Sequence, residues 1–113
     1  MAGKILSNKQ INNLVRRLAQ KAEEDKMRIG RAFIFGSYAK NKMNKNSDLD
    51  LCFVSNGFDK PIEVEAYLRT ELYFLNPNIG IPIDIVAYHP RDFQKTVPLV
   101  YEIQASGREV KLN

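Results

Sequence analysis

The 113-residue chain contains a single cysteine, Cys52, and a single histidine, His89. One cysteine cannot form a disulfide within the chain, and it excludes a cysteine-rich zinc site. Because no second histidine can join His89 in a metal site, we interpret it as a surface residue of a turn. Cys52 is expected to be a small buried side chain with little reactivity. A chain without disulfides fits a reducing compartment, so the predicted location is the cytoplasm.

Long apolar runs are also missing. No stretch is long enough to cross a bilayer, and the opening residues MAGKILSNKQ lack the apolar core of a signal peptide. We therefore expect no association with a membrane. Internal repeats, low-complexity tracts and Pro- or Gly-rich linkers are absent from the sequence, which predicts a single domain over residues 1–113.

Neither sign of charge dominates the composition. Seventeen Lys and Arg against thirteen Asp and Glu leave a net charge of +4. This small excess favours polyanions such as nucleotides, but it is far below the signature of a nucleic-acid-binding protein. Exposed aromatic residues are not interleaved with the basic ones, so direct binding of nucleic acid is the weaker interpretation. Arg16, Arg17 and Lys21 are more simply the solvated face of a helix.

The spacing of apolar residues predicts helices and strands in alternation. Ser7 and Gln10 form a capping box ahead of a helix predicted over about residues 7–26. Gly107 is interpreted as a left-handed cap at the end of the last helix. Such an order predicts an α/β or α+β domain, a sheet layered with helices. The remaining predicted elements are strands over 32–35, 49–54 and 81–88, helices over 61–75 and from about 96 to 107, and a closing strand in REVKL.

Acidic residues mark two of the predicted strands. Asp48 and Asp50 begin the second strand and lie on one of its faces, where their like charges repel each other. A divalent cation with oxygen ligands, such as Mg²⁺, would compensate this repulsion. Asp84 lies within the apolar segment IPIDIVAY, where a carboxylate is costly to bury without a partner. If this third strand pairs beside the second, Asp84 completes a cluster of three carboxylates.

A glycine-serine pair, Gly36-Ser37, ends the first predicted strand, and ten residues separate it from Asp48. Glycine lets the backbone approach a phosphate closely, and the turn after it can present N–H groups to an anion. Three carboxylates can hold two metal ions about 3.5–4 Å apart, an arrangement used in phosphoryl and nucleotidyl transfer. Taken singly, each motif is more often a turn or a solvated strand end, so the prediction depends on their combination. The predicted nucleotide-binding residues are Gly36, Ser37, Lys40 and Ser47.

The pattern of GS at 36–37 and DLD at 48–50 resembles the signature of the nucleotidyltransferase superfamily related to DNA polymerase β. With its short length, PIDIVAY segment and EIQASGREVKL tail, the chain resembles the minimal nucleotidyltransferases, MNT-domain antitoxins that act with HEPN-domain toxins. The resemblance implies a palm-like nucleotidyltransferase fold, a small mixed β-sheet with flanking helices. It also implies that Asp48, Asp50 and Asp84 are the catalytic residues and the metal ligands, with Asp84 helping to activate the acceptor hydroxyl.

One departure from the family pattern lies in the loop after the glycine-serine pair. The family often has Arg-Gly where this chain has Lys40-Asn41. Asparagine tolerates a left-handed backbone better than most residues, so the loop conformation is expected to persist. Lysine keeps the positive charge but cannot grip a phosphate with two parallel hydrogen bonds.

The resemblance implies Mg²⁺-dependent transfer of a nucleotide monophosphate, AMP from ATP, to a hydroxyl group on a HEPN-type helical partner. Larger relatives carry a second domain, so this chain is expected to complete its cleft through that partner or through homo-oligomerisation. Two alternatives stay open within the enzyme class, a small-molecule acceptor such as an aminoglycoside and the end of an RNA. A third alternative is a binding subunit that blocks its partner sterically without turning over nucleotide.

Overall fold

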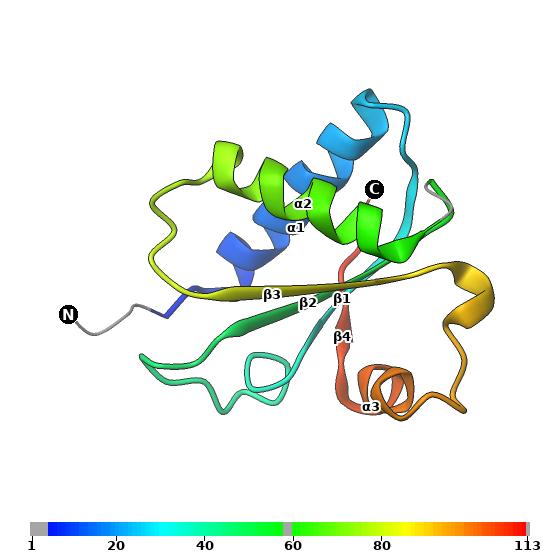
Figure 1. The fold of residues 1–113 in the computed structure, drawn as a ribbon. Coiled ribbons are helices and arrows are strands. Elements are labelled where there is room, and N and C mark those ends of the chain that lie inside the picture. Colours follow the sequence, from blue (N-terminus) through cyan, green and yellow to red (C-terminus); the bar gives the residue numbers. More distant parts are fainter. Residues whose placement is uncertain (1–4, 58–59, 113) are drawn as a thin grey trace.

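In the computed structural model, which describes residues 5–57 and 60–112, four strands form one mixed sheet. The strand order is β3-β2-β1-β4, with β2 parallel to β3 and β1 antiparallel to both of its neighbours. Figure 1 shows α1 and α2 on one face of the sheet and α3 on the other. The predicted mixed sheet with flanking helices is therefore confirmed. Along the chain the elements are α1 (Asn8–Glu24), β1 (Ile29–Phe35), β2 (Leu49–Ser55), α2 (Pro61–Leu75), β3 (Ile83–Tyr88), η1 (Pro90–Asp92), α3 (Pro98–Ser106) and β4 (Arg108–Glu109).

The first helix begins as the sequence predicts. The Ser7 hydroxyl accepts a hydrogen bond from the Gln10 N–H at 3.1 Å, and the Ser7 N–H donates to Gln10 Oε1 at 2.8 Å. These two bonds satisfy N–H groups that a helix start would otherwise leave unpaired. The helix ends at Glu24, slightly earlier than expected, because Lys26 turns to a left-handed conformation with φ of 67°.

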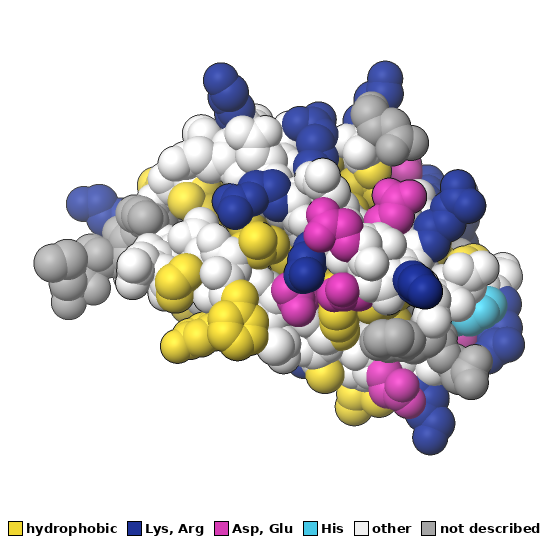
Figure 2. All heavy atoms as spheres, turned by 90° about the horizontal axis from the view of Figure 1, so that it is seen from above, with side chains coloured by type: hydrophobic (Ala, Val, Ile, Leu, Met, Phe, Trp, Pro, Cys, Tyr) yellow, Lys and Arg dark blue, Asp and Glu magenta, His cyan; other side chains and the backbone are white. Residues whose placement is uncertain are grey.

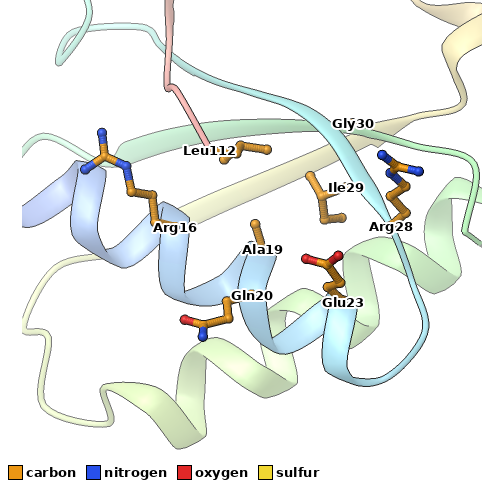
Figure 3. Close-up of a pocket in the computed structure, with 8 residues that line it drawn as sticks. All are labelled: Arg16, Ala19, Gln20, Glu23, Arg28, Ile29, Gly30 and Leu112. Atoms are coloured by element: carbon orange, nitrogen blue, oxygen red, sulfur yellow. The ribbon is translucent and has the colours of Figure 1, made fainter.

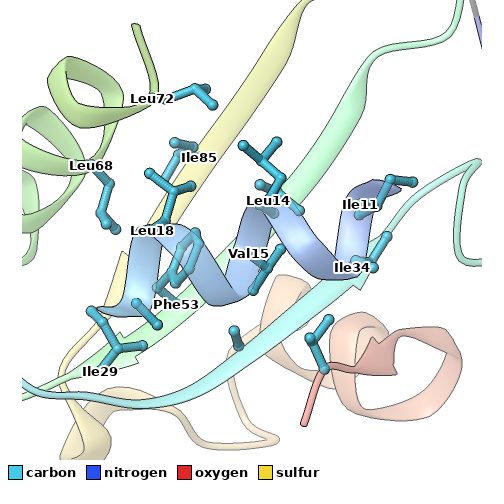
Figure 4. Packing of buried hydrophobic residues seen from close by; sticks show 14 of the residues in the cluster. Ile11, Leu14, Val15, Leu18, Ile29, Ile34, Phe53, Leu68, Leu72 and Ile85 are labelled. Carbon is cyan, nitrogen blue, oxygen red and sulfur yellow. The ribbon is translucent and has the colours of Figure 1, made fainter. Parts of the chain in front are cut away.

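The larger part of the core lies between the sheet and the helices α1 and α2. Figure 4 shows Leu14, Val15 and Leu18 of α1 against Phe53 and Ile85 of the sheet. The central strand β2 is almost wholly buried, because helices cover both of its faces. A smaller cluster on the opposite face joins the sheet to α3. The described part of the chain contains no helix with the length and apolar character needed to cross a membrane.

The outer edge of β3 is covered by side chains of α2. Arg69 Nη2 donates to the Ile85 carbonyl at 3.0 Å, and the Ala87 N–H donates to Glu65 Oε2 at 3.0 Å. Both α2 residues therefore bond to the β3 backbone. An exposed strand edge can pair with another chain, and these contacts block such pairing between Ile85 and Ala87.

The end of α3 differs from the sequence prediction. Gly107 caps the helix with φ of −76° and ψ of 165°, which is extended and not left-handed. The chain passes directly from the helix into β4, so no reversal of the backbone is needed. Glycine is required for a different reason, because a Cβ at Gly107 would clash with the carbonyl oxygen of Ile103. The prediction of a left-handed cap is wrong, although the helix ends where the sequence indicated.

The starts of two strands also differ from the prediction. β1 begins at Ile29, three residues before the predicted start, and its second and third residues, Gly30 and Arg31, are exposed. A strand start with two exposed residues in succession does not show the alternation that sequence patterns detect. At β3 the strand begins at Ile83, so Ile81 lies before it and packs into the core from a loop.

Candidate functional site

Two carboxylates lie side by side at the start of β2 and β3. Because these strands run parallel, Asp50 pairs in register with Asp84. Residues in register on neighbouring parallel strands point to the same face of the sheet. The next residues on that face, Cys52 and Val86, pack in the cluster under α3, so both carboxylates lie on the α3 side. The sequence analysis expected Asp84 to approach Asp50 if the third predicted strand paired beside the second, and this pairing is present.

The electrostatic environment of Asp50 is strongly acidic. The pKa of Asp50 is raised to about 6, chiefly by partial burial and then by the charges of Asp84, Asp48 and Glu102, in that order. Asp48 and Asp84 are themselves exposed, so water screens them better than Asp50. The Asp50 carboxylate is therefore the group at this site whose charge is least well compensated.

The turn at Gly36 lies directly against Asp50. The last residue of β1, Phe35, is in register with Asp50, and the chain turns at Gly36 with a left-handed φ of 71°. A Cβ at this position would clash with Oδ2 of Asp50, so glycine is needed both for the backbone angle and for the close approach. The structure thus brings Gly36, Asp50 and Asp84 together, although they come from three separate segments of the chain.

The loop that follows Gly36 is tightly folded. The Lys40 N–H donates to the Gly36 carbonyl at 3.1 Å, and the Lys42 N–H donates to the Ser37 carbonyl at 2.9 Å. Asn41 adopts φ of 57°, which is the left-handed conformation expected where the family often has glycine. The departure from the family pattern therefore leaves a sharply turned loop intact.

The other two predicted nucleotide-binding residues lie at the ends of this loop. Ser47 closes a turn just before β2, where its hydroxyl accepts from the Asn44 N–H at 2.8 Å. Lys40 reaches towards α3, where its ammonium pairs with Glu102 Oε1 at 3.2 Å. In this structure the Ser47 hydroxyl thus stabilises the turn before β2, and the Lys40 ammonium is paired with the Glu102 carboxylate of α3.

The donor atoms at the site suit a hard divalent cation. All three predicted ligands are carboxylates, which Mg²⁺ prefers, and repulsion at Asp50 is the condition that a cation relieves. Within the residues that the structure describes, no three His, Cys, Asp or Glu side chains are grouped closely enough to hold a metal ion. The ligand roles of Asp48, Asp50 and Asp84 therefore stay a prediction.

A cavity of about 520 Å³ lies elsewhere, between α1, the start of β1 and Leu112 (Figure 3). The charged residues in its lining are Arg16, Arg28 and Glu23. None of the lining residues belongs to the acidic pair or to the turn at Gly36, and α1 covers the sheet face opposite to α3. This cavity has no paired carboxylates and does not share the chemistry of the acidic site.

The outer face of α1 and α2 is mixed in charge. Figure 2 shows Lys and Arg side chains interspersed there with acidic side chains, alongside a group of hydrophobic ones. Among the exposed apolar residues, Tyr73 and Phe74 near the end of α2 are 66% and 71% exposed and contact each other edge to face. The sequence left open whether these aromatics serve the core or a partner surface, and both point outward. Tyr67, by contrast, is partly buried and packs against the core.

Glu102 is the residue at the site that sequence reasoning missed. It lies on α3, far along the chain from the acidic motifs, and no short pattern connects it with them. Its neighbour Ile103 is fully buried against the sheet, whereas the Glu102 side chain is exposed to solvent. Only the packing of α3 across the sheet places this carboxylate near Asp50 and Lys40.

With this geometry in view, comparison with known proteins identifies the class. Residues 11–110 match the sequence model of the family described as "Nucleotidyltransferase domain". The chain belongs to this family and is a nucleotidyltransferase. No match to the chain was found among curated proteins.

Several solved structures share the fold, among them two of toxin–antitoxins. A crystal structure of a toxin–antitoxin with AMP-PNP superposes with a TM-score of 0.61 at 19% identity, over 90% of this chain and 73% of that one. A crystal structure of a mutant of the toxin–antitoxin MntA-HpeT gives a TM-score of 0.59 at 19% identity, over 96% of this chain and 75% of the other. At such low identity the likeness shows the nucleotidyltransferase fold alone.

Proposed function

We propose that this chain transfers AMP from ATP to a hydroxyl group on a HEPN-type helical partner, and that it acts as an antitoxin by this modification. The observation that carries the proposal is the register that sets Asp50 beside Asp84, against the turn at Gly36. Nucleotidyl transfer chiefly needs a fixed position for the triphosphate and neutralisation of its charge. A carboxylate pair next to a glycine turn supports both requirements.

Each predicted site residue has a role in this proposal. Bound magnesium would neutralise charge on the triphosphate and make the acceptor hydroxyl a better nucleophile. The turn at Gly36 leaves room for a phosphate to approach the backbone, because glycine has no Cβ to obstruct it. The proposed ligands of two Mg²⁺ ions are Asp48, Asp50 and Asp84, and the proposed nucleotide contacts are Gly36, Ser37, Lys40 and Ser47.

The proposed reaction forms one bond and breaks another. The acceptor oxygen attacks the α-phosphorus, and the bond from that phosphorus to the oxygen bridging to the β-phosphate breaks. Pyrophosphate leaves with the bonding electron pair. Asp84 takes up the hydroxyl proton in this scheme, because it is the exposed member of the pair and can pass the proton on to water.

The proposal of a protein partner has two supports. The two similar structures are of toxin–antitoxins, one of them with an ATP analogue. In addition, Tyr73 and Phe74 offer an exposed apolar surface suited to contact with another protein. A cytoplasmic location, where ATP is at hand as the donor, belongs to the same proposal.

Labelled ATP tests this function directly. The chain is incubated with Mg²⁺, a HEPN-type helical protein as the acceptor, and ATP carrying the label on either the α- or the γ-phosphate. Transfer of AMP puts α-label but no γ-label on the partner, whereas phosphoryl transfer would do the reverse. The label should vanish in the variant Asp48→Ala/Asp50→Ala and persist in Glu23→Gln, which removes a carboxylate from α1 instead.

Other outcomes would redirect the assignment. Tight association with the partner that is unaffected by Asp48→Ala/Asp50→Ala, without any labelling, would indicate a sterically acting binding subunit. Label on an added aminoglycoside or RNA, with none on the partner, would retain the reaction and replace the acceptor. Light scattering of the chain alone and of the mixture would separate a homo-oligomer from a complex with the partner.

A further inference from the structure

Lys40 and Glu102 form an ion pair that bridges the loop after β1 and helix α3. The distance from Lys40 Nζ to Glu102 Oε1 is 3.2 Å. The loop that carries Lys40 begins at Gly36, which lies against Asp50, and α3, which carries Glu102, packs on the same face of the sheet as Asp50. This contact therefore lies next to the place where the proposed function puts a triphosphate.

The backbone on each side holds the pair in position. On the loop side, Tyr38 is buried and the Lys40 N–H bonds to the Gly36 carbonyl, so Lys40 is carried by a fixed turn. On the helix side, Ile103 is buried next to Glu102 and anchors this turn of α3 to the sheet. Both residues of the pair are thus carried by backbone that is anchored to the core.

Glu102 also acts on the acidic pair. Its negative charge raises the pKa of Asp50, together with Asp84 and Asp48. In this structure the Lys40 ammonium is paired with Glu102 of α3. A triphosphate must therefore displace the Glu102 carboxylate before it can bind the Lys40 ammonium.

We propose that Glu102 is a positioning residue of the nucleotide site. In the nucleotide-free protein it holds the ammonium of Lys40, and the triphosphate of ATP competes with the Glu102 carboxylate for that ammonium. This inference rests on the proposed function, because it takes Lys40 to be a nucleotide contact. Binding of ATP therefore breaks the ion pair between Lys40 and Glu102. The affinity for nucleotide is consequently lower than it would be in a protein whose Lys40 had no carboxylate partner.

The effect is bounded by the exposure of the pair. The side chains of Lys40 and Glu102 are 41% and 47% exposed, so water and salt screen their attraction. An exposed ion pair of this kind is worth only about a two- to five-fold change in an equilibrium constant. Loss of the competition from Glu102 should therefore change the affinity for nucleotide by about that factor. We expect the variant Glu102→Gln, which keeps the shape of the side chain, to bind nucleotide more tightly by this factor.

A double-mutant cycle with AMP-PNP and Mg²⁺ tests the inference. Dissociation constants are measured by calorimetry for the wild type, Glu102→Gln, Lys40→Ala and the double variant, after thermal unfolding has verified that each is folded. Glu102→Gln should tighten binding about two- to five-fold when Lys40 is present and should change it little when Lys40 is alanine. The control Glu23→Gln makes the same change in net charge on α1 and should leave the constant unchanged.

Four results would overturn the inference. Equal tightening by Glu102→Gln in both backgrounds would mean that Glu102 repels the nucleotide directly and does not act through Lys40. Equal effects of Glu102→Gln and Glu23→Gln would reduce the role of Glu102 to net charge. No effect of Glu102→Gln, with normal binding by the wild type, would remove the competition and leave the proposed function intact, whereas no binding by the wild type would overturn both.

Discussion

Gly36 and Asp50 lie so close together that a single added Cβ at Gly36 would overlap the Asp50 carboxylate. This contact joins the turn after β1 to the start of β2, and the register of β2 with β3 then adds Asp84. A backbone turn and two carboxylates are thereby fixed within one small region. The relationship makes the site sensitive to changes of one methyl group or one charge.

Gly36→Ala should both destabilise the protein and weaken nucleotide binding. Alanine is strained at a φ of 71°, and its Cβ would displace the Asp50 carboxylate. We expect a loss of about 1–3 kcal/mol in the free energy of unfolding, measured with urea, together with impaired binding of AMP-PNP. Gly30→Ala is the matched control, because a Cβ there would meet only the Val54 carbonyl oxygen at 3.5 Å, an ordinary contact. Equal effects of the two substitutions would contradict the role given to Gly36.

Mg²⁺ should stabilise the wild type through the acidic pair. A cation bound by Asp50 and Asp84 binds the folded state only, and at ten times its dissociation constant it adds about 1.4 kcal/mol, or roughly 4–8 °C in Tm. The variant Asp50→Asn/Asp84→Asn should lose this response, and Glu23→Gln should keep it. Differential scanning fluorimetry with and without Mg²⁺ measures the shift. A response that survives in the double variant would place the cation elsewhere.

The stability of the metal-free protein should depend on pH through Asp50. The pKa of this group is raised to about 6 in the folded state from 3.8, so the folded protein binds the proton more tightly than the unfolded chain. The resulting stabilisation is present below about pH 4 and is lost as the pH rises through 6. Asp50→Asn carries no such charge, so its advantage over the wild type should grow between pH 4 and 7, by about 1–2 kcal/mol after allowing for screening.

Urea unfolding in the presence of EDTA at several pH values measures this difference. A constant gap between Asp50→Asn and the wild type from pH 4 to 7 would show that repulsion at Asp50 does not titrate in this range. Added Mg²⁺ should reduce the gap at pH 7, because the cation compensates the carboxylates of the wild type but gains less from the asparagine.

Cys52 should be inert in the folded protein. Its side chain is fully buried between the sheet and α3. Burial, together with the charge of Glu65, raises the pKa of its thiol to about 12. The thiolate that reacts with disulfide reagents is then scarce at neutral pH. We expect no reaction with DTNB at pH 8 in buffer and full reaction in urea, so Cys52 reports unfolding. Rapid labelling of the native protein would contradict the burial.

The sequence by itself predicted the elements and the local motifs of this fold. The apolar stripe of α1 and the capping box at Ser7 depend on residues within one or two turns of each other, so they are visible in the sequence. The same holds for Gly36 and for Asp48 and Asp50, which are separated by one loop. Where local signals were ambiguous, as at Gly107, the prediction of the cap was wrong although the boundary was right.

The tertiary structure alone decided which side chains meet. Whether Asp84 lies beside Asp50 depends on β3 pairing parallel with β2, and a shift of one residue would turn Asp84 to the opposite face. The approach of Glu102 to Lys40 depends on how α3 packs across the sheet, through buried contacts such as that of Ile103. Strand register and helix packing depend on how all the core side chains fit together. A short sequence pattern contains no information about that fit.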